Sequence, residues 1–480
     1  MKLLIMKTQI TFLLVFFFLQ SFKSQNGICL TQAQNPNASL VSTPALDKGD
    51  FNNDGKEDIC VSGSDTSLYG ISVIKLYSSS GSGSFTASTH TLNFANKLNA
   101  RRIDFLKTGD FNSDGKPDVF ALCHSDSIFY LNGTGNGSLN AAVSFSLPYE
   151  PTALLINDFN SDGKNDLVVT SNVTPSVSIL FGNGTGGFSS INHYSLALPA
   201  TQLVSGDFNN NGTLDIYLIT GGNSYFMKGS GTGGFTITPT FSLDCGSLKV
   251  EDINSDNKLD LVYSDLTSSK LCVRMGNGNF TFSSVTTYSV NKIKGGSSIT
   301  AVGPVEIADF NKDGNKDIAV LSDDMNISVF LGAANGVFSN SATYTLNSTG
   351  FYLIVFNLIA ADISGDGKQD IVVLAGDMGQ TYLGELKVFL NCNTVGINKE
   401  YYIAGKIKLF PNPAKDYLQI ETSENTFNRI FIYNELGQLL REEELENNTL
   451  NISELSNGVY SLVLKDKNSL TVSKCFIIAR

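Results

Sequence analysis

The sequence predicts an all-β protein: a seven-bladed β-propeller over residues 25–393, then a small immunoglobulin-like β-sandwich over residues 406–480. Three observations predict this fold. A nine-residue acidic motif recurs seven times at intervals of about 50 residues, which is the length of a four-stranded blade. Short segments rich in β-branched residues alternate with glycine-rich turns between the motifs. No copy of the motif follows residue 393, where the composition changes.

The composition narrows the classes of function. The chain has 480 residues and a formal net charge of −12, so we expect no nucleic-acid partner, because a polyanion requires a basic surface. Hydrophobic residues make up 42% of the chain, which excludes general disorder. Seven scattered cysteines without a C-x-x-C pair indicate neither a zinc site nor a disulfide scaffold.

Residues 1–24 have the pattern of a secretory signal peptide. Lys2 and Lys7 supply positive charge, a short apolar segment over residues 10–19 follows, and Ser24 is small enough to precede cleavage. Phe22 is bulky for the third position before that cut, so the cleavage site stays open. A membrane anchor is the alternative, but a stable span needs about 20 apolar residues. We therefore expect no transmembrane span in the mature chain.

The repeated motif has the form D-x-N-x-D-G-x-x-D. Positions 1, 3, 5 and 9 offer side-chain oxygens, position 7 offers a carbonyl, and the glycine at position 6 permits the positive φ that curls the loop. Calcium prefers such oxygen ligands, so we expect up to seven structural Ca²⁺ sites, with plain Asx-type turns as the alternative. The candidate ligands are Asp50, Asn52, Asp54, Lys56, Asp58; Asp110, Asn112, Asp114, Lys116, Asp118; Asp158, Asn160, Asp162, Lys164, Asp166; Asp207, Asn209, Asn211, Thr213, Asp215; Asp252, Asn254, Asp256, Lys258, Asp260; Asp309, Asn311, Asp313, Asn315, Asp317; and Asp362, Ser364, Asp366, Lys368, Asp370.

Three copies depart from this form. Asn211 replaces the middle carboxylate of the fourth copy, so the Asp207 loop is expected to bind calcium most weakly. Asn257 takes the turn position of the fifth copy, and Ser364 replaces the amide ligand of the seventh. An EF-hand is not indicated, because β-branched segments follow the loops and no bidentate Glu stands at position 12.

Glycine-rich turns follow the third predicted strand of several blades. Residues 182–187 and 229–234 both have the form G-x-G-x-x-G. A dinucleotide site would need a helix directly afterwards, whereas Phe188 and Phe235 each begin another alternating segment. We expect hairpin turns between the third and fourth strands.

The seven motifs and their flanking strands resemble the FG-GAP or VCBS repeat family, which includes the propellers of integrin α subunits. The resemblance implies calcium loops on one face of a closed ring and ligand contacts on the opposite face. Blade seven ends near Cys392 without a fourth strand, which residues 28–32 would supply. Cys29 and Cys392 would then lie on adjacent strands, and we hypothesise a disulfide between them, with two separate thiols as the alternative. Cys60, Cys123 and Cys272 are expected to be buried thiols.

The C-terminal region, after an expected linker at residues 394–405, resembles the type A C-terminal sorting domain of the type IX secretion system. The resemblance lies in residues 409–413 (L-F-P-N-P), 434–438 (N-E-L-G-Q), 455–460 (L-S-N-G-V-Y) and the ending K-C-F-I-I-A-R. It implies export across the outer membrane of a Gram-negative bacterium by that machinery, followed by release or attachment to the cell surface. An immunoglobulin-like accessory domain is the alternative. The expected core positions are Leu418, Ile420, Ile430, Ile432, Leu439, Val459, Leu462, Leu464, Phe476 and Ile478.

Two functions remain. The first is a secreted, calcium-binding propeller that acts as a binding or adhesion module for a protein or glycan, and the second is an extracellular polysaccharide lyase or hydrolase. His90, His124 and His193 fall on different elements and in no nucleophile motif, so we expect no enzyme and assign no catalytic residue. Candidate ligand-binding residues lie in the loops between second and third strands and in one inter-blade loop: Tyr69, Arg101, Arg102, His124, Asp265, Asp324 and Tyr382.

Overall fold

The computed structural model describes residues 28–32, 40–41, 45–65, 71–81, 84–92, 103–123, 127–147, 151–265, 268, 270–290, 302–322, 326–345, 353–377, 383–393, 407–422, 427–434, 438–444, 449–466 and 471–480. The predicted signal peptide and linker lie outside these residues. The described residues contain strands and turns and no helix, so the predicted all-β class is confirmed.

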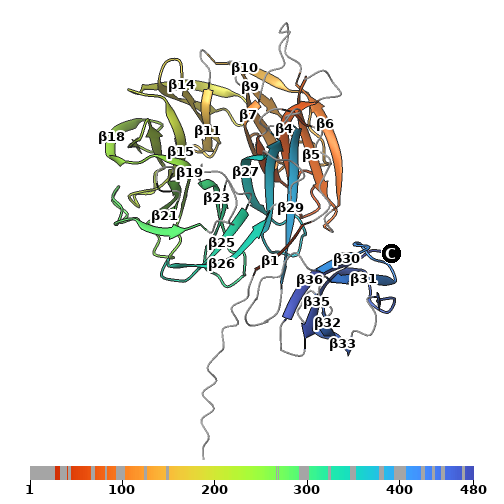
Figure 1. The fold of residues 1–480 in the computed structure, drawn as a ribbon. Coiled ribbons are helices and arrows are strands. Elements are labelled where there is room, and N and C mark those ends of the chain that lie inside the picture. Colours follow the sequence, from red (N-terminus) through yellow and green to blue (C-terminus); the bar gives the residue numbers. More distant parts are fainter. Residues whose placement is uncertain are drawn as a thin grey trace, which may run out of the picture.

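Six four-stranded antiparallel meanders follow one another along the chain, and a seventh blade combines three further strands with residues 28–32. Figure 1 shows them as a progression of colours around a ring, from orange through green to blue. Blade 1 contains β3 (Leu46–Gly49), β4 (Asp58–Asp65), β5 (Ile71–Ser79) and β6 (Phe85–Thr91). Blade 2 contains β7 (Ile103–Gly109), β8 (Asp118–Cys123), β9 (Ser127–Leu131) and β10 (Val143–Ser146). Blade 3 contains β11 (Pro151–Asn157), β12 (Asp166–Ser171), β13 (Ser176–Gly182) and β14 (Phe188–Ser195). Blades 4 and 5 contain β15 (Ala200–Gly206), β16 (Asp215–Thr220), β17 (Asn223–Gly229) and β18 (Phe235–Ser242); and β19 (Cys245–Glu251), β20 (Asp260–Asp265), β21 (Lys270–Arg274) and β22 (Thr286–Ser289). Blades 6 and 7 contain β23 (Val302–Ala308), β24 (Asp317–Ser322), β25 (Asn326–Gly332) and β26 (Phe338–Thr345); and β27 (Leu353–Ala361), β28 (Asp370–Asp377), β29 (Leu383–Asn393) and β1 (Ile28–Gln32).

The ring closes on itself at its innermost strands. Each first strand of a blade contacts the first strand of the next, and β27 of blade 7 contacts β3 of blade 1. Figure 1 shows β7, β11, β15, β19, β23 and β27 around the centre of the ring. A seven-bladed β-propeller is therefore the fold of this part of the chain.

The N-terminal strand completes the last blade, as the sequence predicts. Strand β1 pairs antiparallel with β29, with Ile28 opposite Asn393 and Cys29 opposite Cys392. A short additional strand, β2 (Leu40–Val41), pairs with both β29 and β4, so blades 7 and 1 share one continuous sheet. This extra pairing was not predicted.

Both faces of each sheet are buried against the neighbouring blades. In β12, Leu167 and Val169 join the apolar cluster toward blade 2, whereas Val168 between them joins the cluster toward blade 4. Successive side chains of a strand point to opposite faces, so a central strand covered on both sides reads as a continuous apolar run. Residues 371–374 and the equivalent segments of the other blades are rich in apolar residues for this reason.

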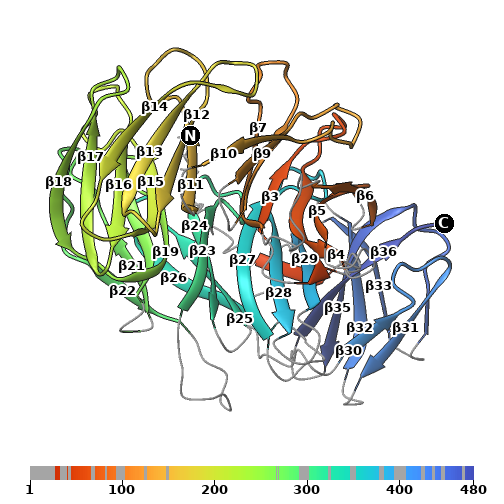
Figure 2. The ribbon, with the colours of Figure 1, turned by 90° about the horizontal axis from the view of Figure 1, so that it is seen from above.

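The C-terminal region forms two sheets. One has the order β30 (Ile407–Phe410), β31 (Tyr417–Thr422), β34 (Thr449–Asn451), and the other β33 (Leu439–Glu444), β32 (Phe427–Tyr433), β35 (Gly458–Asp466), β36 (Thr471–Ile478). In Figure 2 they form a separate group of blue strands. Eight of the ten expected core residues are buried in one cluster. Val459 is only partly buried, and the prediction for Leu439 is wrong: it lies on edge strand β33 and is 49% exposed.

Within the described residues, no helix has the length and hydropathy to cross a membrane.

Candidate metal centre

The seven acidic loops join the first and second strands of their blades and share one backbone conformation. Position 6 has positive φ in every loop, including Asn257 at 61° where the others have glycine. Position 4 has positive φ as well, which the sequence analysis missed. Only Asn53, Asn210 and Gly365 gave a signal for this in the sequence, because asparagine and glycine tolerate the left-handed region better than serine or lysine does. Position 4 is Asn53, Ser113, Ser161, Asn210, Ser255, Lys312 and Gly365.

The aspartate at position 1 organises the curl. In the third loop, Asp158 Oδ1 accepts the N–H of Asp162 at 3.1 Å and Oδ2 accepts the N–H of Gly163 at 2.7 Å. Asn160 Oδ1 accepts the same Asp162 N–H at 3.0 Å, so the oxygens of positions 1 and 3 converge inside the loop. Five other loops repeat this arrangement. In the seventh, the N–H of Ser364 donates instead to Asp370.

The aspartate at position 9 is buried and ties the loop to the rest of the blade. Asp166 Oδ2 accepts the N–H of Phe159 at loop position 2 (2.9 Å), and Oδ1 accepts the N–H of Gly182 at the end of the third strand (2.9 Å). The equivalent aspartates of blades 1, 2, 4, 5 and 6 repeat both bonds. Asp370 accepts from Ser364 and Asn391. This structural role, beyond a ligand role, could not be read from the motif.

Burial perturbs these carboxyl groups. It raises the pKa of Asp58, Asp166 and Asp260 to about 6, and that of Asp317 and Asp370 to about 7. The backbone N–H donors act in the opposite direction but only partly offset the burial. A cation beside these groups would favour their ionised form.

The side chain at position 7 contacts the side chain at position 5 in every loop. Five loops pair a lysine with an aspartate, at Nζ–Oδ2 distances from 2.8 Å (Lys368–Asp366) to 3.9 Å (Lys116–Asp114). In the fourth loop Thr213 Oγ donates to Asn211 Oδ1 at 2.7 Å, and in the sixth Asn315 Nδ2 donates to Asp313 Oδ1 at 2.7 Å. Only the carbonyl of position 7 had been expected to take part.

The loops fit a hard divalent cation by donor type, since they gather carboxylate, amide and carbonyl oxygens on one tight curl. Within the described parts of the chain, no three acidic, His or Cys side chains come together as a metal cage. The position-5 oxygens are directed at position 7, and the position-9 oxygens at backbone N–H groups.

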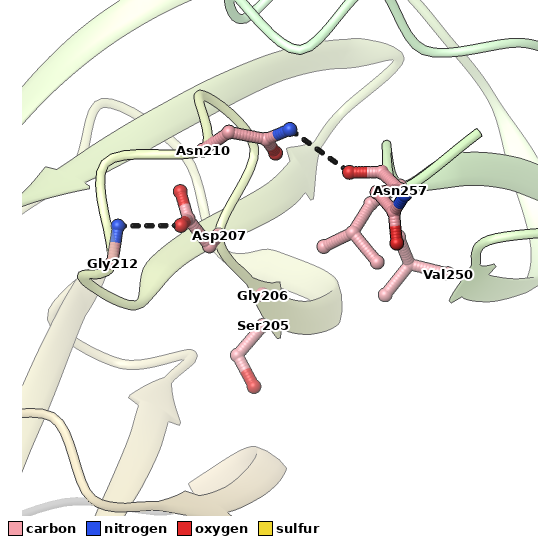
Figure 3. A pocket seen from close by; sticks show the side chains of 8 residues that line it. Ser205, Gly206, Asp207, Asn210, Gly212, Val250 and Asn257 are labelled. Atoms are coloured by element: carbon pink, nitrogen blue, oxygen red, sulfur yellow. Dashed lines mark hydrogen bonds between the residues drawn. The ribbon is translucent and has the colours of Figure 1, made fainter.

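Neighbouring loops also contact one another. Asn210 of blade 4 donates from Nδ2 to the carbonyl of Asn257 in blade 5 at 2.9 Å, as Figure 3 shows. A cavity of about 590 Å³ lies between these two blades, beside Asp207 and Leu259. The loops of blades 7 and 1 are joined by Glu57, whose Oε2 accepts the N–H of Asp362 at 2.7 Å. Direct hydrogen bonds therefore join the loops of blades 4 and 5 and those of blades 7 and 1.

Of the candidate ligand-binding residues, Asp265 alone is described. It ends β20, is half-buried, and accepts the N–H of Ser268 at 2.9 Å through Oδ1. Tyr69, Arg101, Arg102, His124, Asp324 and Tyr382 lie outside the described residues.

Two of the three histidines are described, and each bonds to a serine of its own blade. His90 Nε2 lies 3.2 Å from Ser88 Oγ, and His193 Nδ1 lies 2.9 Å from Ser178 Oγ. Ser88 and His90 lie on the same outer strand, β6, whereas His193 on the outer strand β14 is the cross-strand partner of Ser178 on β13.

Comparison with known proteins gives the family. The protein-family model described as FG-GAP-like repeat matches this chain six times, from the first acidic loop to the seventh. The matched residues are 50–121, 110–169, 158–218, 207–263, 252–320 and 309–373. The model described as secretion system C-terminal sorting domain matches residues 408–479. No curated protein matches the sequence.

The chain is similar to solved structures at low sequence identity. One of BBS1N in complex with ARL6DN, soaked with mercury, has a TM-score of 0.52 and 12% identity, covering 76% of this chain and 98% of that chain. The same complex soaked with lead gives 0.49 and 13%, covering 77% and 99%. An Agrocybe aegerita lectin that recognises non-reducing terminal N-acetylglucosamine gives 0.47 and 16%, covering 65% and 81%.

These findings confirm both resemblances drawn from the sequence. The sorting domain indicates export by the type IX secretion system to the cell surface or the extracellular space, and implies contact with that machinery. The repeats extend over most of the chain that precedes it. The chain belongs to the FG-GAP-like repeat family, as an exported β-propeller with a C-terminal sorting domain.

Proposed function

We propose that this exported propeller is a calcium-stabilised binding or adhesion module for an extracellular protein or glycan, and that it is not an enzyme. The observation that carries the calcium part is the sevenfold repetition of one loop geometry. Each loop directs the oxygens of position 1, and in six loops those of position 3, toward its interior. Plain turns need no such repeated set of carboxylates.

The binding part is supported by the architecture. Each blade is held by its neighbours through apolar clusters on both faces, so the ring is a rigid support for the turns at its two ends. Loops on a rigid scaffold are the usual place for recognition. The two described histidines lie on the outer strands of blades 1 and 3, so they do not meet in one site, which favours a binding role over acid–base catalysis.

Thermal unfolding of the full-length protein in calcium, magnesium and chelator tests the calcium part. A ligand that binds only the native state raises its stability by mass action, so we expect the melting temperature to fall in chelator and recover with calcium. Asp313→Ala should lower the calcium-dependent gain more than Asn211→Ala, because it removes a charged ligand. Equal melting temperatures in calcium and chelator would overturn calcium stabilisation.

Glycan and protein arrays test the binding part. We expect calcium-dependent retention on a defined subset of glycans or proteins. The same preparation is incubated with a panel of polysaccharides. Sustained cleavage of any of them would overturn the binding assignment in favour of a lyase or hydrolase.

A further inference from the structure

We propose that the side chain at loop position 7 competes with the bound cation for the side chain at position 5, and thereby sets the calcium affinity of each loop. The inference rests on the calcium binding proposed above. It assigns a role to a position whose side chain is not itself a ligand, and it predicts which of the seven loops fill first.

The recurring feature is the pair of positions 5 and 7. Five loops have a lysine at position 7, and each of these lysines forms an ion pair with the aspartate at position 5. The other two loops have no lysine at position 7. Where position 5 has lost its charge, as in Asn211, position 7 is the neutral Thr213. Where position 5 is Asp313, position 7 is Asn315, so this loop keeps three carboxylates, and position 7 places an amide on Asp313 where five other loops place an ammonium.

In blades 2, 3 and 5 the side chain of the position-7 lysine lies against the hairpin turn of its own blade. A Cβ added at Gly184, in the turn after β13, would lie 3.1 Å from Cδ of Lys164. The equivalent turn glycines Gly135 and Gly278 approach Lys116 and Lys258 in the same way, at 3.0 and 3.2 Å. The aliphatic stem therefore lies across the turn and directs the ammonium to the position-5 carboxylate.

An ammonium on a carboxylate oxygen repels a second cation that approaches the same group, and the effect grows as solvent is excluded. The side chain of Lys164 is 42% exposed and its ion pair measures 3.5 Å, so screening keeps its effect small. Lys368 is 8% exposed and lies 2.8 Å from Asp366, so it is the strongest competitor.

These contacts predict an order of calcium affinity among the loops that differs from the order predicted by the number of carboxylates in each loop. The Asp309 loop should fill first, because it has three carboxylates and no lysine at position 7. The Asp362 loop should fill last, because it combines the most buried ammonium with Ser364 at position 3. Carboxylate number alone places the Asp207 loop last.

Hydrogen–deuterium exchange with mass spectrometry on the full-length protein, titrated with free calcium, resolves the loops because each lies in a different peptide. The readout is the calcium concentration at which half of the protection of that loop is reached. Native mass spectrometry of the same samples counts the bound ions. We expect the Asp309 loop to respond at the lowest calcium concentration and the Asp362 loop at the highest.

Two matched pairs of variants separate competition from general electrostatics. Asn315→Lys should raise the midpoint of its own loop about two- to fivefold, whereas Thr213→Lys should change its loop less, because Asn211 offers no charge to hold the ammonium. Lys368→Met should lower the midpoint of the Asp362 loop by about fivefold. Lys312→Met removes an ammonium that donates to the backbone carbonyl of Asp366 at 3.3 Å, and should have the smaller effect on that loop.

The outcomes distinguish this inference from the function on which it rests. Absence of bound ions and of any calcium-dependent protection would overturn the calcium proposal itself. Bound ions together with equal effects of the two variants within each pair, or with unmoved midpoints, would overturn competition by position 7 and leave calcium binding intact.

Discussion

At the scale of single residues, the most consequential group is the position-9 aspartate, which places a carboxyl group inside each blade. This aspartate accepts hydrogen bonds from two backbone N–H groups and so fixes the loop to the third strand. Asp317, for example, accepts from the N–H groups of Phe310 and Gly332. Burial raises the pKa of Asp317 to about 7, so in the native protein this carboxyl retains its proton at a pH where an unfolded chain has lost it. Burying the ionised carboxylate costs free energy, and either a bound proton or a nearby metal ion lowers that cost.

The stability of the chelated protein should therefore rise on acidification. A native pKa above the unfolded value means that the native state binds more protons between about pH 4 and 7, so the free energy of unfolding increases as the pH falls through that window. We expect a higher melting temperature in chelator at about pH 5.5 than at about pH 8, measured by scanning calorimetry. With saturating calcium this gain should shrink, because calcium favours the ionised carboxylates.

The variant Asp317→Asn serves as the control for that experiment. It keeps the size of the side chain, replaces one of the two acceptor oxygens by an NH2 donor, and removes one titrating group with a strongly raised pKa. The variant should therefore be less stable overall, and the pH difference in chelator should become smaller. A chelated protein that loses stability steadily from about pH 8 to 5.5 would contradict the account.

At the scale of elements, the glycine that ends the third strand determines how the hairpin meets the acidic loop. A Cβ at Gly182 would lie 2.1 Å from the carbonyl oxygen of Asn165, and the equivalent glycines of four other blades are equally close to loop backbone. Blades 1 and 7 have Ser79 and Asn391 instead, and both side chains donate to carbonyls of the preceding blade, Ile363 and Phe310, at 2.6 Å.

Gly182→Ala should consequently destabilise the protein severely. The new methyl group would meet rigid backbone, so we expect a loss of at least about 2–3 kcal/mol in denaturant unfolding, through displacement of the loop and the Asp166 bond. Gly222→Ala is the matched change, because Gly222 has positive φ but open space around its Cβ position, and should cost about 1 kcal/mol. Similar losses for both would show that backbone conformation, and not contact with Asn165, is what Gly182 provides.

The elements also show how far the sequence alone leads. The motif spacing predicted the blades, the loop between strands one and two, and the hairpin character of the G-x-G-x-x-G turns, because these depend on local patterns. It did not predict which way a side chain faces, so the burial of Asp166 and the pairing of Lys164 with Asp162 were missed. Leu439 was misassigned because an alternating apolar pattern does not distinguish a core strand from the edge strand of a small sandwich.

At the scale of the whole molecule, closure of the ring is the step that no local pattern specifies. The chain returns over more than 300 residues to bring β1 beside β29, and the loop-closure entropy of that contact must be offset by the seam between blades 7 and 1. The seam has polar contacts of its own. Asn357, at a bulge in β27, donates to the carbonyl of Leu46, and Glu57 joins the two acidic loops.

A disulfide between Cys29 and Cys392 would secure this seam covalently, and we predict that the exported protein contains it. The two residues are direct partners on antiparallel strands, where Cα atoms lie about 4.5–5.5 Å apart, within the range that a disulfide requires. Because the bond would enclose nearly the entire propeller, the chain-entropy estimate of its stabilisation is about 6 kcal/mol, which is an upper value because measured stabilisation by disulfides falls short of this estimate. Peptide mapping of secreted protein without reduction should recover the two cysteines in one linked peptide pair.

Cys29→Ser should lower the melting temperature to that of reduced wild type, and a reductant should then have no further effect on the variant. Complete alkylation of both thiols in the unreduced secreted protein would exclude the bond and leave closure to the strand pairing and the polar seam alone.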